Sequence, residues 1–144
     1  MSDLKKKRIL VVDDDPRIAK LLKMVLSDYD VHAVTDGETA LEEAKAAPPS
    51  LFIIDLILPG MRGTTLAVLL RDQPRFFETP IFLISGLIES PSDDREPVRV
   101  NGLTAFNKPF DIEKMRKHVR LHVEKPEEAA ATLEKLRVGR ITGE

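Results

Sequence analysis

The sequence predicts an α/β fold in which a parallel sheet is doubly wound, with helices on both of its faces. Three observations support this prediction: short apolar runs recur along the chain, amphipathic segments separate them, and proline, glycine and aspartate mark the junctions. Strands that alternate with helices imply parallel crossovers. Runs without a polar face imply strands that are buried on both sides. The expected architecture is therefore a three-layer sandwich.

Five strands are expected in the first 124 residues. Each is a short, mainly apolar run, and turn residues or amphipathic segments lie on either side of it. These runs are Ile9–Val12, Val31–Val34, Leu51–Ile54, Ile81–Ile84 and Leu103–Phe106.

Helices are expected between these strands, because apolar side chains recur there at i, i+3, i+4 and i+7. The first begins at Asp15 and Pro16, where the aspartate can cap the helix and the proline suits its first turn. The later helices are expected to begin near Asp36, Thr64 and Asp111. Between the fourth and fifth strands, Pro91 and Pro97 would each cost a helix interior about 3 kcal/mol. A helix there is either short or missing.

The length, composition and charge of the chain exclude several classes of function. At 144 residues, with 42% hydrophobic and 32% charged residues, the chain suits one globular domain. The formal net charge of −2 gives no overall field that would attract nucleic acid or an anionic membrane. Without cysteine, a disulfide framework and a thiol nucleophile are excluded. No apolar run is long enough for a membrane span or a secretory signal, so we expect a cytoplasmic protein that binds neither nucleic acid nor membrane.

Polar residues follow four of the predicted strands, and in a parallel sheet these positions meet at one edge. They are Asp13, Asp14 and Asp15 after the first strand, Asp55 after the third, Ser85 and Gly86 after the fourth, and Asn107, Lys108 and Pro109 after the fifth. Clustered carboxylates repel one another unless a cation joins them, and oxygen ligands suit Mg²⁺. A carboxylate beside that ion can attack phosphorus, while a lysine and a hydroxyl contact the phosphoryl oxygens. The set predicts Mg²⁺-dependent phosphoryl transfer to an aspartate.

Several of these polar residues also have ordinary structural interpretations. Asp15 is best explained as a helix cap, because Pro16 follows it. Asp55 differs, since it interrupts a long apolar run in which an unpartnered aspartate is costly to bury. His118 and His122 lie four residues apart, a spacing that can bind metal, but no carboxylate or cysteine stands at ligand spacing beside them. We expect surface or flanking positions for both histidines.

The motifs resemble the receiver domain of two-component response regulators over about residues 8–124. The matching pieces are ILVVDDDP, LFIIDLILPGMRG, IFLISG and NKPF, of which LPGMRG and KPF are the most specific. The resemblance implies a flavodoxin-like sheet of five parallel strands in the order 2-1-3-4-5, with two helices on one face and three on the other. It also implies that a histidine kinase or phosphotransfer protein donates the phosphoryl group. Such a domain is not an enzyme for outside substrates and catalyses only its own phosphorylation and dephosphorylation.

The resemblance assigns roles to individual residues. Asp55 corresponds to the phosphoacceptor, Ser85 to the hydroxyl residue that contacts the phosphoryl group, and Lys108 to the family's lysine. The implied Mg²⁺ ligands are Asp13, Asp14, Asp55 and the backbone carbonyl of Ile57. Of the acidic pair, Asp14 is the favoured direct ligand.

Two departures from the family pattern precede the lysine. Ala105 stands three residues before Lys108, where receivers commonly carry an aromatic residue whose rotamer couples to phosphorylation. The glycine expected seven positions before the lysine is displaced to Gly102, and Asn101 takes its place. We therefore expect an intact acidic pocket and an altered output surface.

The residues beyond this region are too few for an output domain. We interpret residues 1–124 as the receiver and 125–144 as a C-terminal extension, a short helix from Pro126 followed by a disordered end. The predicted function is a stand-alone receiver that signals by contact with an unidentified downstream protein, with a homodimer left open. One alternative is a pseudo-receiver whose partner binding does not depend on phosphorylation. A second, a Mg²⁺-dependent phosphatase, is disfavoured because Ile57 stands where its second aspartate would be.

Overall fold

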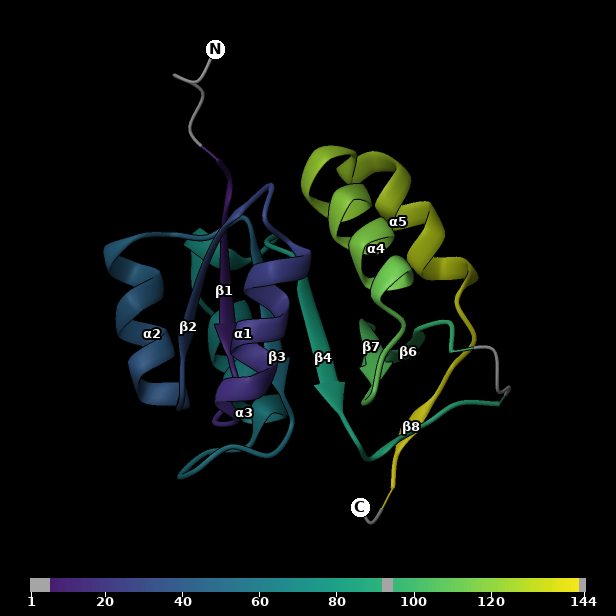
Figure 1. Cartoon of the computed structure of the whole chain (residues 1–144), viewed down its shortest axis with the longest axis horizontal. Helices are drawn as coiled ribbons and strands as arrows, with labels where there is room; N and C mark the ends of the chain where they lie inside the picture. Colours follow the sequence, from purple (N-terminus) through teal and green to yellow (C-terminus); the bar gives the residue numbers. More distant parts are fainter. Residues whose placement is uncertain (1–5, 92–94, 143–144) are drawn as a thin grey trace.

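A six-stranded sheet forms the centre of the molecule (Figure 1) in the computed structural model, which describes residues 6–91 and 95–142. Its strands are β1 (Arg8–Val12), β2 (Asp30–Val34), β3 (Leu51–Asp55), β4 (Ile81–Ser85), β6 (Val98–Val100) and β7 (Leu103–Asn107). Their order is β2-β1-β3-β4-β7-β6, and all neighbours are parallel except β6 and β7. The predicted α/β class and the order 2-1-3-4-5 of the parallel strands are confirmed, with β7 as the fifth.

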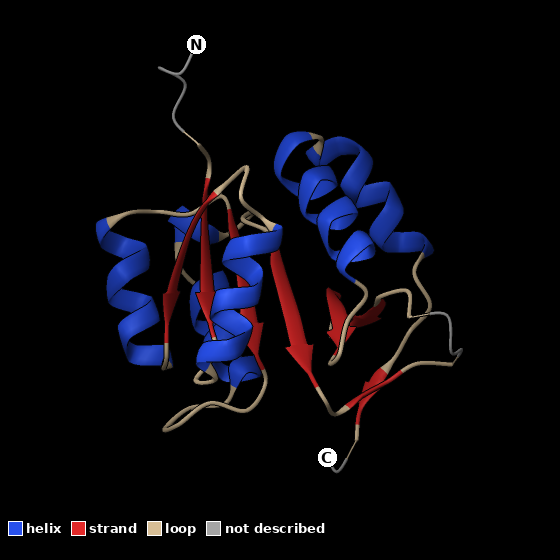
Figure 2. Ribbon diagram, viewed as in Figure 1, coloured by secondary structure: helices blue, strands red, loops and turns tan. Residues whose placement is uncertain are grey.

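Helices cover both faces of this sheet (Figure 2). They are α1 (Pro16–Val25), α2 (Gly37–Ala46), α3 (Gly63–Arg71), α4 (Ile112–Glu124) and α5 (Pro126–Lys135), with a short 3₁₀ turn, η1, at Pro74–Phe76. In β1, Ile9 and Val11 pack under α1 and α4, whereas Leu10 and Val12 pack under α2 and α3. Both faces of the strand are therefore apolar, because each faces a helical layer. Within the described residues, no helix has the length and apolar character that a membrane span requires.

Three helices begin at aspartates, as the sequence predicted. The carboxylates of Asp15, Asp36 and Asp111 accept hydrogen bonds from backbone N–H groups two or three residues on, at 2.9, 2.8 and 3.0 Å. Each satisfies an N–H group that has no partner within the helix. Asp15 is thus the cap of α1, and its interpretation as a helix cap is confirmed.

For the connection from β4 to β7, the sequence predicted a helix that is either short or missing, and the described residues agree with the second alternative. Among its described residues, 86–91 and 95–102, there is no helix; instead β5 (Ile88–Glu89) and β6 occur. β6 and β7 form a hairpin whose two turn residues, Asn101 and Gly102, have φ angles of 54° and 77°. Positive φ at both positions is the type I′ geometry, which Asn-Gly favours. The pair therefore stabilises a hairpin, while Pro91 and Pro97 oppose a helix.

The residues after α4 are more ordered than predicted. α5 begins at Pro126, as expected, and buries Ala129. The expectation of a disordered end is wrong for residues 136–142, because β8 (Arg140–Ile141) pairs antiparallel with β5 and Val138 forms a bridge to Arg99. The division into a receiver and an extension at residue 124 stays a prediction.

His118 is buried inside the fold, so the expected surface or flanking position is wrong for this residue. Its side chain is 1% exposed, and its ring packs 5.9 Å from that of Phe106. Neither ring nitrogen has a hydrogen-bond partner, although Nε2 lies 3.7 Å from a carboxylate oxygen of Glu96. His122 is half-buried, with its ring against Phe82. Apolar packing across α4 and the sheet explains the burial of His118 better than a metal site does.

Acidification is expected to destabilise the protein through these histidines. Burial lowers the pKa of both His118 and His122 below the ordinary value of about 6.5. The unfolded chain therefore binds more protons below about pH 6.5, and the free energy of unfolding falls as the pH drops through this range. Urea unfolding at several pH values, with His118→Phe beside the exposed-site control His32→Gln, measures the effect. If the free energy of unfolding depended on pH in His118→Phe as it does in the wild type, this explanation would be contradicted.

Candidate functional site

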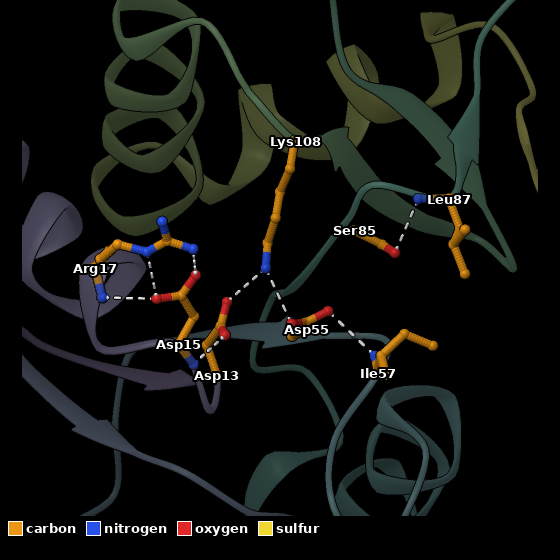
Figure 3. Close-up of polar contacts among 8 residues, drawn as sticks. All are labelled: Asp13, Asp15, Arg17, Asp55, Ile57, Ser85, Leu87 and Lys108. Atoms are coloured by element: carbon orange, nitrogen blue, oxygen red, sulfur yellow. Dashed lines mark hydrogen bonds and ion pairs between the residues drawn. The ribbon is translucent and has the colours of Figure 1, made fainter.

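Four strand ends meet at one edge of the sheet and bring together residues up to 95 positions apart (Figure 3). Asp13 and Asp14 directly follow β1, and Asp55 ends β3. Ser85 ends β4, and Lys108 directly follows β7. These strand ends lie at the same height in the sheet because the strands pair in parallel. Asp55 at the end of β3, for example, pairs with Ile84 in β4. The predicted convergence of these side chains is therefore observed.

Lys108 joins the two buried carboxylates. Its Nζ donates to Oδ2 of Asp13 at 2.8 Å and to Oδ2 of Asp55 at 3.0 Å. The side chain of Asp13 is fully buried, that of Asp55 is 9% exposed, and that of Lys108 is 22% exposed. One cation thus compensates two carboxylates that have little access to water.

The remaining oxygens of these carboxylates are held by the backbone. Oδ1 of Asp13 accepts from the N–H of Asp15 at 2.9 Å, and Oδ1 of Asp55 accepts from the N–H of Ile57 at 3.1 Å. Each carboxylate is therefore fixed on two sides, by its own turn and by Lys108. The proposed role of the Ile57 carbonyl as a metal ligand stays a prediction.

The electrostatics of the site reflect burial and excess negative charge. Burial raises the pKa of Asp13, and the charge of Asp55 acts in the same direction, against the hydrogen bonds from Lys108 and Asp15. Burial alone would lower the pKa of Lys108, but its hydrogen bonds to Asp13 and Asp55 outweigh that effect and raise it. Lys108 therefore stays protonated, and the site carries more carboxylate than ammonium charge.

An oxygen-rich cluster suited to a divalent cation lies in this site. Asp13, Asp14 and Asp55 each offer a carboxylate oxygen, and these oxygens lie within 4.8 Å of one another. Asp14 is exposed, whereas the other two are buried. Carboxylate oxygens without nitrogen or sulfur ligands fit Mg²⁺, which also retains water molecules. The three residues therefore fit the ion that the sequence predicted.

The hydroxyl group of Ser85 is bonded to the backbone beside the acidic cluster. The residue is 1% exposed, and its Oγ accepts a hydrogen bond from the N–H of Leu87 at 3.0 Å (Figure 3). Its carbonyl oxygen accepts from the N–H of Lys108 at 2.9 Å, which ties the ends of β4 and β7 together. The hydroxyl hydrogen can still be donated to a ligand at the site.

A pocket of about 320 Å³ lies beside Lys108, where the chain carries Ala105 instead of an aromatic residue. Its apolar wall consists of Ile88, Val98 and Ala105, all of them buried. Asn107 and Lys108 line the side next to the acidic cluster. The small side chain of Ala105 therefore leaves open space between β5, β7 and the site.

Comparison with known proteins identifies the family. The model of the response regulator receiver domain matches residues 9–120. The chain belongs to this family. The receiver domain is 34% identical over 135 residues to the alkaline phosphatase synthesis transcriptional regulatory protein PhoP of Bacillus subtilis (strain 168), which covers 89% of this chain and 53% of PhoP.

Two further proteins are similar to this chain over most of its length. The sensor histidine kinase TmoS of Ectopseudomonas mendocina is 35% identical over 118 residues, which are 78% of this chain and 12% of TmoS. The high-resolution structure of the chemotaxis response regulator CheY4 of Vibrio cholerae matches with a TM-score of 0.66 and 26% identity, over 81% of this chain and 98% of CheY4. The receiver domain thus spans about half of PhoP and a small part of TmoS.

Proposed function

We propose that this receiver domain is a Mg²⁺-dependent phosphoacceptor and that Asp55 is the residue that takes the phosphoryl group. The observation that carries the proposal is the bridge from Lys108 to Asp13 and Asp55 beside the exposed carboxylate of Asp14. A nucleophilic carboxylate, a fixed cation and oxygen ligands for a metal are the components of phosphoryl transfer.

The proposed reaction begins when a carboxylate oxygen of Asp55 attacks the phosphorus of a phosphohistidine on a kinase or phosphotransfer protein. An O–P bond forms and the N–P bond breaks, and the electron pair of that bond stays on the histidine nitrogen, which takes up a proton. Lys108 then contacts the charged phosphoryl oxygens, and Ser85 donates its hydroxyl hydrogen to one of them. Hydrolysis of the acyl phosphate returns Asp55 to its free form.

Asp13, Asp14, one oxygen of Asp55 and the Ile57 carbonyl would hold the Mg²⁺ ion. When bound, the ion would neutralise charge on the phosphoryl oxygens. Asp13 and Asp55 are already fixed by backbone N–H groups, so this ligand set needs little rearrangement.

Output is proposed to occur through contact with a downstream protein, and turnover of outside substrates is not expected. A stand-alone organisation stays a prediction, because relatives such as PhoP and TmoS extend well beyond the matched region.

Incubation with acetyl phosphate and Mg²⁺ is expected to add the mass of one phosphoryl group to the intact protein. The transfer breaks the P–O bond to the acetyl group and releases acetate. Asp55→Asn should stay unmodified, and removal of Mg²⁺ with EDTA should abolish the mass gain in the wild type. An unmodified wild type, or equal modification of Asp55→Asn, would refute the proposal.

A pseudo-receiver is the second candidate, because the connection before β7 and the residue at Ala105 depart from the family pattern. Its partner affinity would be the same with and without phosphorylation. Once a partner is identified by pull-down, titration of both forms separates the two functions. A phosphorylated protein whose affinity does not change would favour the pseudo-receiver.

A further inference from the structure

The tail, defined as residues 136–142, is bound to β5 and to β6, the two strands within the connection from β4 to β7. The N–H of Thr142 donates to the carbonyl of Leu87 at 2.7 Å, and β8 pairs with β5. The N–H of Gly139 donates to the carbonyl of Arg99 at 3.0 Å, and the N–H of Arg99 donates to Arg137 at 2.8 Å. Figure 1 shows β8 beside the segment that follows β4, which contains its partner strand β5.

Gly139 lies in a tight contact that fixes the position of the tail. A Cβ atom at this residue would overlap a methyl group of Val98 and lie 2.6 Å from the carbonyl oxygen of Glu89. An ion pair between Arg140 and Glu89 adds a side-chain contact between the strands. The tail is therefore closely packed against β5 and β6.

Leu87 connects this tail directly to Ser85. Its N–H donates to Oγ of Ser85 at 3.0 Å, and its carbonyl accepts from Thr142. Only two hydrogen bonds therefore separate the Ser85 hydroxyl from the tail. Rotation of the Ser85 side chain about its Cα–Cβ bond would move Oγ away from Leu87, remove the acceptor of the Leu87 N–H and loosen the turn that carries β5.

The pocket beside Ala105 gives β5 room to move. Ile88 forms part of its wall and is paired with Ile141 of the tail. Displacement of Ile88 into the pocket would separate this pair without first expelling another side chain. A shift of β5 into this space, driven through the contact between Leu87 and Ser85, would let the site control the position of the tail.

We propose that the tail is a latch that phosphorylation of Asp55 releases. This inference rests on the proposed function. When the Ser85 side chain rotates and carries Oγ toward the phosphoryl group, its bond with Leu87 breaks, β5 shifts toward the pocket beside Ala105, and β8 separates from β5. In the unphosphorylated protein the tail covers β5 and the outer side of β6. In the phosphorylated protein these strands become accessible to the downstream partner.

Hydrogen exchange of the full chain, measured by mass spectrometry with and without acetyl phosphate and Mg²⁺, tests the latch. Intact mass of the same samples gives the phosphorylated fraction. Exchange in residues 136–142 is expected to accelerate about tenfold on phosphorylation, as the loss of a few coupled hydrogen bonds requires, while β1 stays protected. A phosphorylated protein with an unchanged tail would overturn the latch and leave the proposed function intact.

One variant tests the latch when no phosphoryl group is added. Ser85→Ala removes the acceptor for Leu87, so exchange in the tail should accelerate to a similar degree in the absence of any donor. If the tail of Ser85→Ala exchanges as in the wild type, the coupling through Leu87 is wrong. This result does not depend on phosphorylation, so it tests the coupling through Leu87 separately from the proposed function, which absence of the mass gain in the wild type would refute.

Gly139→Ala tests the coupling from the opposite direction. It should detach the tail and, because coupling between two sites is reciprocal, raise the phosphorylated fraction several-fold at subsaturating acetyl phosphate. Val138→Ala is the matched control, since Val138 is a 66% exposed neighbour in the same segment. A loosened tail in Gly139→Ala without a change in the phosphorylated fraction would contradict the latch.

Discussion

Gly63→Ala is expected to lower the free energy of unfolding by about 3 kcal/mol or more, the upper range for overpacking of a core. Gly63 begins α3, and its N–H donates to the carbonyl of Leu56 at 2.9 Å. A Cβ atom there would overlap the carbonyl oxygen of Asp55 and lie 2.9 Å from Cα of Leu56. These are backbone atoms, so no side chain can rotate away. Relief requires α3 to move from the end of β3, which carries Asp55, the proposed phosphoacceptor.

Urea unfolding followed by circular dichroism measures this effect, and the acetyl phosphate assay should show slower modification of the folded fraction. Gly86→Ala is the matched control, because no atom lies within 4 Å of a Cβ there and its φ is not positive. Its stability should stay within about 0.5 kcal/mol of the wild type. Equal stability of Gly63→Ala and Gly86→Ala would show that the close approach of α3 to β3 is not required.

Lys108→Met is expected to lower the free energy of unfolding by about 2–3 kcal/mol. Removal of one partner leaves the buried charges of Asp13 and Asp55 uncompensated, which typically costs about 3–5 kcal/mol, and the 22% exposure of the lysine reduces that cost. Millimolar Mg²⁺ should restore part of the loss, because the ion can replace the missing positive charge. Phosphorylation should also slow about 100-fold, since the fixed cation is lost.

Lys114→Met is the control for this substitution. Lys114 pairs with Glu96 at 2.8 Å at a more exposed position, where an ion pair contributes at most about 1 kcal/mol. Denaturant unfolding of both variants, with and without Mg²⁺, separates the buried cluster from an ordinary surface pair. If Lys108→Met were as stable as Lys114→Met in the absence of Mg²⁺, Lys108 would not be the charge that compensates the site.

The predictable part of the fold is the part that local patterns determine. The β1 run is apolar at every position because both of its faces are covered, so periodicity alone identifies it as a buried strand. The first residues of three helices could be predicted from Asp15, Asp36 and Asp111, because a helix cap involves only residues that are neighbours in the sequence. The convergence of Asp13, Asp55 and Lys108 follows from the rule that parallel strand ends share an edge.

The parts that were missed depend on contacts between distant residues. His118 was expected near the surface because no carboxylate or cysteine stands at ligand spacing beside it, and only the packing of α4 over Phe106 shows that it is buried. The tail was expected to be disordered because Arg140 and Ile141 form a strand only with β5 as partner. The hairpin of β6 and β7 did carry a local signal, since Asn101 and Gly102 lie between alternating apolar residues.

That hairpin also has a consequence for solubility. β6 is a terminal strand of the sheet, and such strands offer unpaired backbone groups on which other molecules can add strands and aggregate. The backbone of Arg137 and Gly139 forms hydrogen bonds with the N–H and carbonyl groups of Arg99, which would otherwise face outward. The segment therefore protects the molecule from edge-to-edge association, and a chain that lost it would tend to self-associate even while the acidic pocket around Asp55 remained folded.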